Sequence, residues 1–213
     1  MERELRITGE GRLSLTPDVV IINLPVEASA KEYSSAIDLL NQKVNTVHDI
    51  LNSNNIEKSK LKSTDFDIRE NWKYYKDKRI KPKLLGYIAS HKLKLEIPLN
   101  NELISSVLDD LSNSNTGISF TLSFDVSEKE QYNKDLIKNA VLDAKASAEV
   151  IASASDINLK EIVNIDYSFS EIHFRNDNIL YESDMMYSDM RMPDFSPEEV
   201  KAQKNITIIW RIE

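Results

Sequence analysis

The sequence predicts an α+β protein, and three observations lead to this fold class. Between residues 19 and 127 the patterns run strand, helix, strand, strand, helix, strand, which is the split βαβ order of ferredoxin-like folds. A long third helix and C-terminal strands extend this core over residues 128–213. Hydrophobic residues make up 41% of the 213 positions, enough for a real core. We predict one domain over residues 1–213, or two lobes at 1–127, with the N-terminal strand, and 128–213.

The first two predicted strands lie in the N-terminal 30 residues. Apolar residues alternate with polar ones over residues 5–15, around Gly9 and Gly11. Glycine inside a strand indicates either a bulge or a close approach of another backbone. Residues 19–30 again place alternate apolar side chains on one face, so we expect a second strand, paired with the first through a short turn.

Three helices are predicted from apolar residues spaced by three and four. They cover residues 31–54, 103–111 and about 128–155. In the third helix one face carries only alanine at every fourth position, namely Ala140, Ala144, Ala148 and Ala152. Such a flat face can lie close against a sheet, and we interpret it as a packing feature.

The remaining strands follow from alternation and from turn residues. Two strands after the first helix form a long hairpin whose tip lies near residues 76–82. Residues 118–126 alternate strictly and give the clearest strand pattern in the chain. We also expect strands at 162–174 and 206–212, separated by an irregular loop over residues 175–197.

Composition excludes several classes of function. The formal charge of -8 argues against bulk attraction to nucleic acid or anionic membranes, although it leaves room for local basic patches. The absence of cysteine excludes disulfides, thiolate metal sites and a cysteine nucleophile. Residues 1–18 lack the apolar run of a secretory signal, so we expect a cytoplasmic protein, or a periplasmic or secreted one if a signal was removed. No window approaches the roughly 20 apolar residues of a spanning helix.

The opening segment ITGEGRLSLTPDVVIINLPVEASA resembles that of SIMPL-domain proteins, a bacterial family of unknown function typified by periplasmic immunogens and stress-associated proteins. The residues that carry this resemblance are Ile7, Gly9, Gly11, Pro17 and Asp18. Further matches along the chain are Ala36, Asn41, the pair Gly86 and Tyr87, and the Ala-rich third helix. The resemblance covers essentially the whole chain. It implies an α+β fold and oligomeric, sometimes ring-like or channel-like, assembly, and it supplies no catalytic residues.

Known catalytic motifs do not fit the sequence. The Gly9-Glu10-Gly11 segment lies inside a predicted strand pair and lacks the third glycine and following helix of a dinucleotide site. The three histidines, His48, His91 and His173, have no zinc-site spacing, and we interpret them as separate structural or surface residues. No Gly-x-Ser-x-Gly elbow occurs. We therefore predict no enzyme activity and no cofactor, metal or catalytic site.

An acidic, methionine-rich loop is one of two unusual segments. Between Glu171 and Glu199 eight carboxylates face only two arginines. Four of the five methionines lie here, namely Met185, Met186, Met190 and Met192. Thioethers, with His173, could bind Cu(I). Methionine is also an adaptable contact residue, so we favour packing or a subunit contact.

The predicted hairpin tip, residues 72–83, is the other unusual segment. Its basic and aromatic residues are Trp72, Lys73, Tyr74, Tyr75, Lys76, Lys78, Arg79, Lys81 and Lys83. Such a mixture suits single-stranded nucleic acid or another polyanion, whereas the acidic total argues against it, and basic tips also protect strand edges. A third interpretation is that the tip docks onto the acidic loop of another subunit. We therefore expect a non-enzymatic, homo-oligomeric scaffold protein, with polyanion binding as the alternative.

Overall fold

A computed structural model gives the fold, and it describes residues 3–76, 79, 81–114, 116–167 and 195–213. The chain divides into two compact units. Unit 1 comprises Met1–Asp18, Asp125–Asp177 and Pro197–Glu213, and unit 2 comprises Val19–Phe124 and Asn178–Ser196. The α+β prediction is confirmed, because the described residues form helices and two antiparallel sheets.

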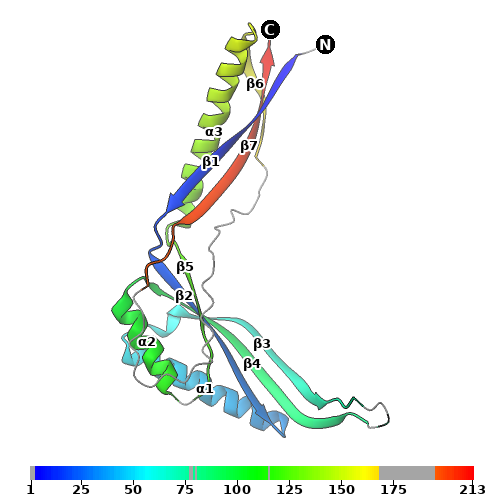
Figure 1. The fold of residues 1–213 in the computed structure, drawn as a ribbon, viewed down its shortest axis with the longest axis vertical. Coiled ribbons are helices and arrows are strands. Elements are labelled where there is room, and N and C mark those ends of the chain that lie inside the picture. The colour runs from blue at the N-terminus through cyan, green and yellow to red at the C-terminus, as the bar shows by residue number, and fades with distance from the viewer. Residues whose placement is uncertain (1–2, 77–78, 80, 115, 168–194) are drawn as a thin grey trace. The chain divides into compact units, whose positions relative to one another are not determined.

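Unit 2 contains a four-stranded sheet in the order β3-β4-β2-β5 (Figure 1). Its strands are β2 (Val19–Ala30), β3 (Leu61–Lys73), β4 (Lys83–Pro98) and β5 (Thr121–Asp125). Strands β2 and β3 each pair antiparallel with β4, which lies between them. They therefore run in the same direction, and the connection that joins them contains a helix.

Two helices cover one face of this sheet and form the larger core. They are α1 (Tyr33–Ser53) and α2 (Asn101–Asn113), and a short 3-10 helix, η1 (Lys58–Lys60), precedes β3. Alternate residues of β2 point into the core, so Val20, Ile22 and Leu24 are fully buried. The Asn100 side chain caps α2 by accepting a hydrogen bond of 3.1 Å from the Leu103 amide.

Unit 1 contains a three-stranded sheet in the order β1-β7-β6, with helix α3 packed on it. The elements are β1 (Glu4–Leu15), α3 (Lys129–Ala154), β6 (Leu159–Asp166) and β7 (Val200–Ile212). The predicted pairing of β1 with β2 is wrong, because β1 pairs with β7 from Glu4 opposite Arg211 to Leu15 opposite Val200. Apolar residues of β1 and β7 share one core under α3, whereas those of β2 are buried in unit 2. Unit 1 therefore combines the N-terminal strand with the helix and strands that follow residue 125.

The two glycines of β1 allow α3 to lie very close to the strand. The register of β1 and β7 is unbroken, so the bulge alternative is wrong and the close-approach alternative is confirmed. A Cβ at Gly9 would lie 2.1 Å from the Ala140 carbonyl oxygen, and one at Gly11 would lie 2.0 Å from that of Leu136. On the helix side, Ala140 and Ala144 are fully buried, as the flat alanine face predicts.

The strand predicted over residues 118–126 is shorter in the structure. Only β5 joins the sheet, while Ile118 and Phe120 lie before it and are nevertheless buried. Strict alternation thus identified the buried side chains correctly but overestimated the length of the hydrogen-bonded strand. The strand predicted over 162–174 corresponds to β6, and residues 168–174 lie outside the described part of the chain.

Asp18, from the Pro-Asp pair, joins the residues after β1 to the residues just before α3. Its carboxylate accepts hydrogen bonds from the Ser127 amide at 2.8 Å and from the Ser127 hydroxyl at 2.6 Å. Its own amide donates to the Asp125 carbonyl oxygen at 3.1 Å. These bonds tie together two segments of unit 1 that are far apart in the sequence.

We expect Gly9→Ala to destabilise unit 1 by about 3 kcal/mol, because the added methyl group overlaps helix backbone that cannot rotate away. Urea unfolding monitored by circular dichroism measures this loss. Gly117→Ala is the control, since a Cβ there meets nothing within 4 Å and only the φ of +64° opposes it, at about 1 kcal/mol. Equal stability of the two variants would contradict the close packing of α3 on β1.

Candidate interaction arm and polar hollow

Strands β3 and β4 continue beyond the end of β2 as a two-stranded ribbon (Figure 1). The last residue of β2, Ala30, lies opposite Tyr87. Beyond it, Asn71 pairs with Gly86 and Trp72 with Leu84. We call residues 71–86 the arm. Because an isolated hairpin is only marginally stable in water, such an extension is suited to gaining contacts from a partner.

The arm brings together most of the residues predicted as an interaction surface. The described members are Trp72, Lys73, Tyr74, Tyr75, Lys76, Arg79, Lys81 and Lys83, and all are exposed. Tyr74 is the most exposed aromatic residue of the described chain, at 75%. Lys78 lies outside the described residues, as do Met185, Met186, Met190 and Met192 of the acidic loop. Docking of the tip onto that loop therefore stays a prediction.

Contacts within the arm order its aromatic rings. The Trp72 indole donates a hydrogen bond of 2.7 Å to the Glu70 carboxylate. The Lys73 ammonium lies 5.5 Å from the centre of the Tyr75 ring, within cation–π range. Lys73 also lies directly opposite Lys83, and such a like-charged cross-strand pair is destabilising.

Two exposed leucines on the arm were missed by sequence reasoning. Leu84 lies opposite Trp72, and Leu85 follows it on the same strand. The sequence did contain a sign of this feature: two consecutive leucines follow a basic run directly, at the start of a predicted strand of the hairpin. The arm is therefore apolar near its base and cationic toward its tip.

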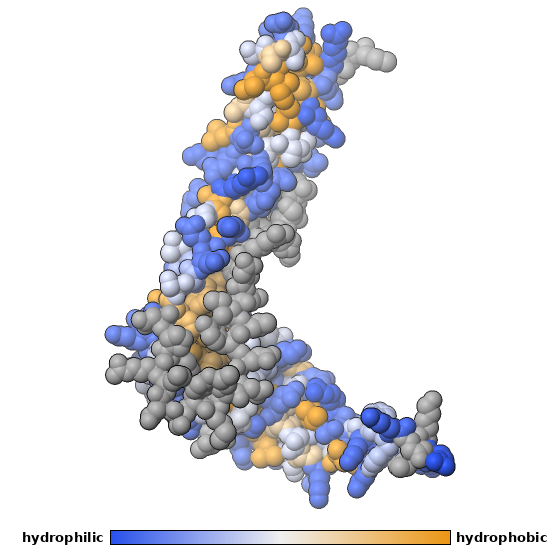
Figure 2. Space-filling model, in the orientation of Figure 1, coloured by the Kyte–Doolittle hydropathy of each residue, from blue (hydrophilic) through white to orange (hydrophobic). Residues whose placement is uncertain are grey.

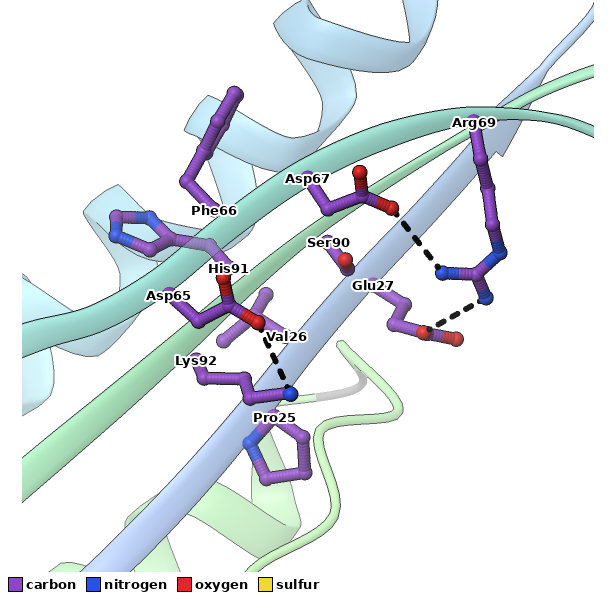
Figure 3. A pocket seen from close by; sticks show the side chains of 10 residues that line it. All are labelled: Pro25, Val26, Glu27, Asp65, Phe66, Asp67, Arg69, Ser90, His91 and Lys92. Carbon is purple, nitrogen blue, oxygen red and sulfur yellow. Dashed lines mark hydrogen bonds and ion pairs between the residues drawn. The ribbon is translucent and has the colours of Figure 1, made fainter.

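A polar hollow of about 390 Å³ lies on the arm-bearing sheet of unit 2 (Figure 3). Its charged and polar lining comes from adjacent strands whose register places these residues in rows. Asp65 and Pro25 flank Lys92 in one row, and Asp67 and Glu27 flank Ser90 in the next. The sequence analysis did not identify this site, because its residues are dispersed over three strands.

Ion pairs occupy the hollow. The Lys92 ammonium lies 3.0 Å from the Asp65 carboxylate, and hydrogen bonding to Lys92, together with its charge, lowers the pKa of Asp65. The Arg69 guanidinium lies 3.4 Å from Glu27 and 3.6 Å from Asp67. All these side chains are about half exposed, so each pair is weak. The hollow is a half-exposed polar surface whose charged side chains pair with one another.

His48 and His91 both belong to unit 2, and their interpretation as separate structural or surface residues stays a prediction. His91 Nε2 lies 2.8 Å from the Ser63 hydroxyl, and its ring meets Phe66 edge-on at 5.7 Å. Burial lowers the pKa of His48, and the positive charges of Lys58 and His91 lower it further. No described carboxylate bonds to His91. Ser63 and His91 therefore lack the third group of a catalytic triad. His173 lies outside the described residues.

The described residues contain neither a metal-binding group of side chains nor a helix that could cross a membrane. No three histidine, aspartate or glutamate side chains among them are grouped so as to hold a metal ion. None of the described helices is both long enough and apolar enough to cross a membrane.

Fold and surface together define a two-unit α+β protein with a projecting basic and aromatic arm. The chain belongs to the SIMPL family, described as a protein of unknown function (DUF541), whose sequence model matches residues 5–210. The resemblance seen in the opening segment and the Ala-rich helix is thereby confirmed. The family match also includes the whole arm.

Three curated relatives are similar to much of the chain. The 26 kDa periplasmic immunogenic protein of Brucella abortus (strain S19) is 27% identical over 164 residues, which are 76% of this chain and 65% of the relative. The protein of the same name from Brucella melitensis biotype 1 gives the same identity and coverage. The uncharacterized protein YggE of Edwardsiella ictaluri (strain 93-146) is 23% identical over 174 residues, covering 82% of this chain and 72% of that protein. The chain thus spans just under two thirds of the Brucella proteins.

We expect His48 to make unit 2 less stable at mildly acidic pH. Because its pKa is lower in the folded protein, the unfolded chain binds a proton first as pH falls below about 6.5. Stability present above that pH is therefore lost below it. His48→Gln should lose less stability between about pH 7.5 and pH 5.5, measured by urea unfolding. His91→Gln is the control and should change the acid-induced loss of stability less, because His91 is a smaller cause of the lowered pKa of His48. If His48→Gln loses as much stability as the wild type between these pH values, His48 is not the group responsible.

Proposed function

We propose that this protein is a non-enzymatic scaffold that assembles into a homo-oligomer. The main support for the proposal is that β6, together with Tyr167 just after it, exposes several apolar side chains. Ile162, Val163, Ile165 and Tyr167 are each 40% to 49% exposed. In the described part of the chain β6 pairs on one side only, with β7. An exposed apolar strand at a sheet edge is a surface that a second copy can bury.

The geometry of β6 favours contact through side chains rather than an extended intermolecular sheet. Its register with β7 shifts twice, between Leu159 and Ile162 and between Ile162 and Asn164. Such irregularities disturb the ladder and hinder continuous pairing with another strand. A contact between identical apolar surfaces closes around a two-fold axis and so limits the size of the assembly.

We propose no catalytic role for Ser63, His91 or the charged residues of the hollow, because these groups have partners in the structure. Ser63 and His91 bond to each other, and the charges of the hollow are paired across strands. We also propose that unit 2 has the ferredoxin-like split arrangement. Its strand order, with β4 between the parallel β2 and β3, supports that assignment.

The alternative function is polyanion binding through the arm. Its support is the group of exposed cations beside Trp72 and Tyr74, since rings and cations together bind single-stranded nucleic acid. Docking of the arm onto the acidic loop of another subunit is a further way in which copies could assemble. The arm and β6 can be tested separately, because they belong to different units.

We expect Ile162→Asp/Ile165→Asp to lower the solution mass, because charges on β6 oppose burial against a second copy. Light scattering coupled to size-exclusion chromatography measures the mass, and circular dichroism checks that the fold is kept. Leu142→Asp is the control, since Leu142 is 54% exposed on α3 of the same unit. A wild-type monomer, or an oligomer unaffected by the β6 substitutions, would refute assembly through β6.

A further inference from the structure

The arm carries a concentration of positive charge on an acidic protein. Its described cations are Lys73, Lys76, Arg79, Lys81 and Lys83. The sequence places one carboxylate among them, Asp77, and the neighbouring Glu70 is bonded to the Trp72 indole. The whole chain has a formal charge of -8, so the arm is opposite in sign to the protein that bears it.

The arm is long enough for its charge to act independently. Lys83 lies four positions along β4 from Tyr87, the residue opposite the last residue of β2, which corresponds to about 13 Å of strand. The tip residues lie further along. At physiological salt the Debye length is about 8 Å, so the charges in the rest of unit 2 are largely screened at the tip. An anionic surface therefore meets mainly the cations.

Exposed aliphatic side chains on the arm favour lipid over nucleic acid as its partner. Trp72 and Leu84 lie opposite each other, and Leu85 is the extra residue at the register shift between the pairs Asn71–Gly86 and Trp72–Leu84. Figure 2 shows hydrophobic and hydrophilic side chains next to one another in this part of unit 2. Leucine cannot stack on bases as an aromatic ring does. Exposed aliphatic groups fit an apolar medium, and tryptophan and tyrosine prefer the membrane–water interface.

We infer that the arm inserts into the surface of membranes that contain anionic phospholipids. The lysines and Arg79 bind headgroup phosphates, which relieves the repulsion between Lys73 and Lys83. Trp72, Leu84 and Leu85 enter the boundary with the acyl chains. This inference goes beyond the proposed assembly, because its partner is a lipid surface and its residues lie outside β6.

Tryptophan fluorescence tests the inference directly, because the chain has only two tryptophans. Trp210 is buried in unit 1, so Trp210→Phe leaves Trp72 as the reporter. With vesicles of phosphatidylglycerol and phosphatidylcholine in equal parts, we expect a blue shift of Trp72 emission and quenching by brominated acyl chains. Vesicles of phosphatidylcholine alone should give neither. If Trp72 emission is unchanged with the anionic vesicles, the inference is wrong.

Charge variants identify the residues responsible. Lys76→Gln/Arg79→Gln/Lys81→Gln should weaken binding to anionic vesicles about fivefold for each cation removed, measured by co-sedimentation. The matched control is Lys134→Gln/Lys138→Gln/Lys145→Gln, which removes three exposed lysines from α3. Equal weakening by both variants would show a general charge effect and would overturn the role of the arm.

Solution mass and nucleic acid binding separate this inference from the other functions of the arm. The arm charge variant should keep the wild-type mass, and a drop in mass would make the arm a contact between copies, against the inference. The β6 variant should still show the Trp72 blue shift even if its mass falls. Binding of a single-stranded oligonucleotide without binding of anionic vesicles would assign the arm to nucleic acid instead.

Discussion

The close contact between the backbones of β1 and α3 determines the rest of unit 1. Gly9 and Gly11 let the alanine face of the helix rest on the strand, so α3 covers β1 and β7. Asp143, on the same helix, accepts a hydrogen bond of 2.8 Å from the Glu10 amide and so occupies part of the outer edge of β1. The opposite edge, at β6, keeps its apolar side chains exposed. The placement of α3 thus covers part of the sheet edge at β1 and leaves the edge at β6 exposed for contact with a partner.

A glycine also marks the base of the arm in unit 2. Gly86 has a φ of +144°, and a Cβ there would lie 2.1 Å from the Ala30 carbonyl oxygen, where β2 ends. The chain leaves the sheet at this point to enter α1, and only β3 and β4 continue. The Gly86-Tyr87 pair, part of the resemblance to the family, therefore separates a strand that belongs to the core from a ribbon that can meet a partner.

Periodicity predicted the helices and the long hairpin well, because both depend on contacts between residues close in sequence. The partner of β1 could not be predicted in this way, since a turn to residues 19–30 looks locally as favourable as pairing with β7. Within the candidate site, charge and aromatic content identified Trp72 and the lysines. Leu84 and Leu85 were missed because their exposure depends on where β2 stops.

The pairing of β1 with β7 imposes an order on folding during synthesis. Residues 19–124 of unit 2 are continuous and can collapse as soon as β5 has left the ribosome. Glu4 pairs with Arg211, so β1 cannot form this pairing until Arg211 has been synthesised. At ordinary rates of translation, synthesis of the residues between them takes about ten seconds or more. Throughout that interval the apolar face of β1 has no partner strand. Release of the C-terminal strand is therefore the event that completes unit 1.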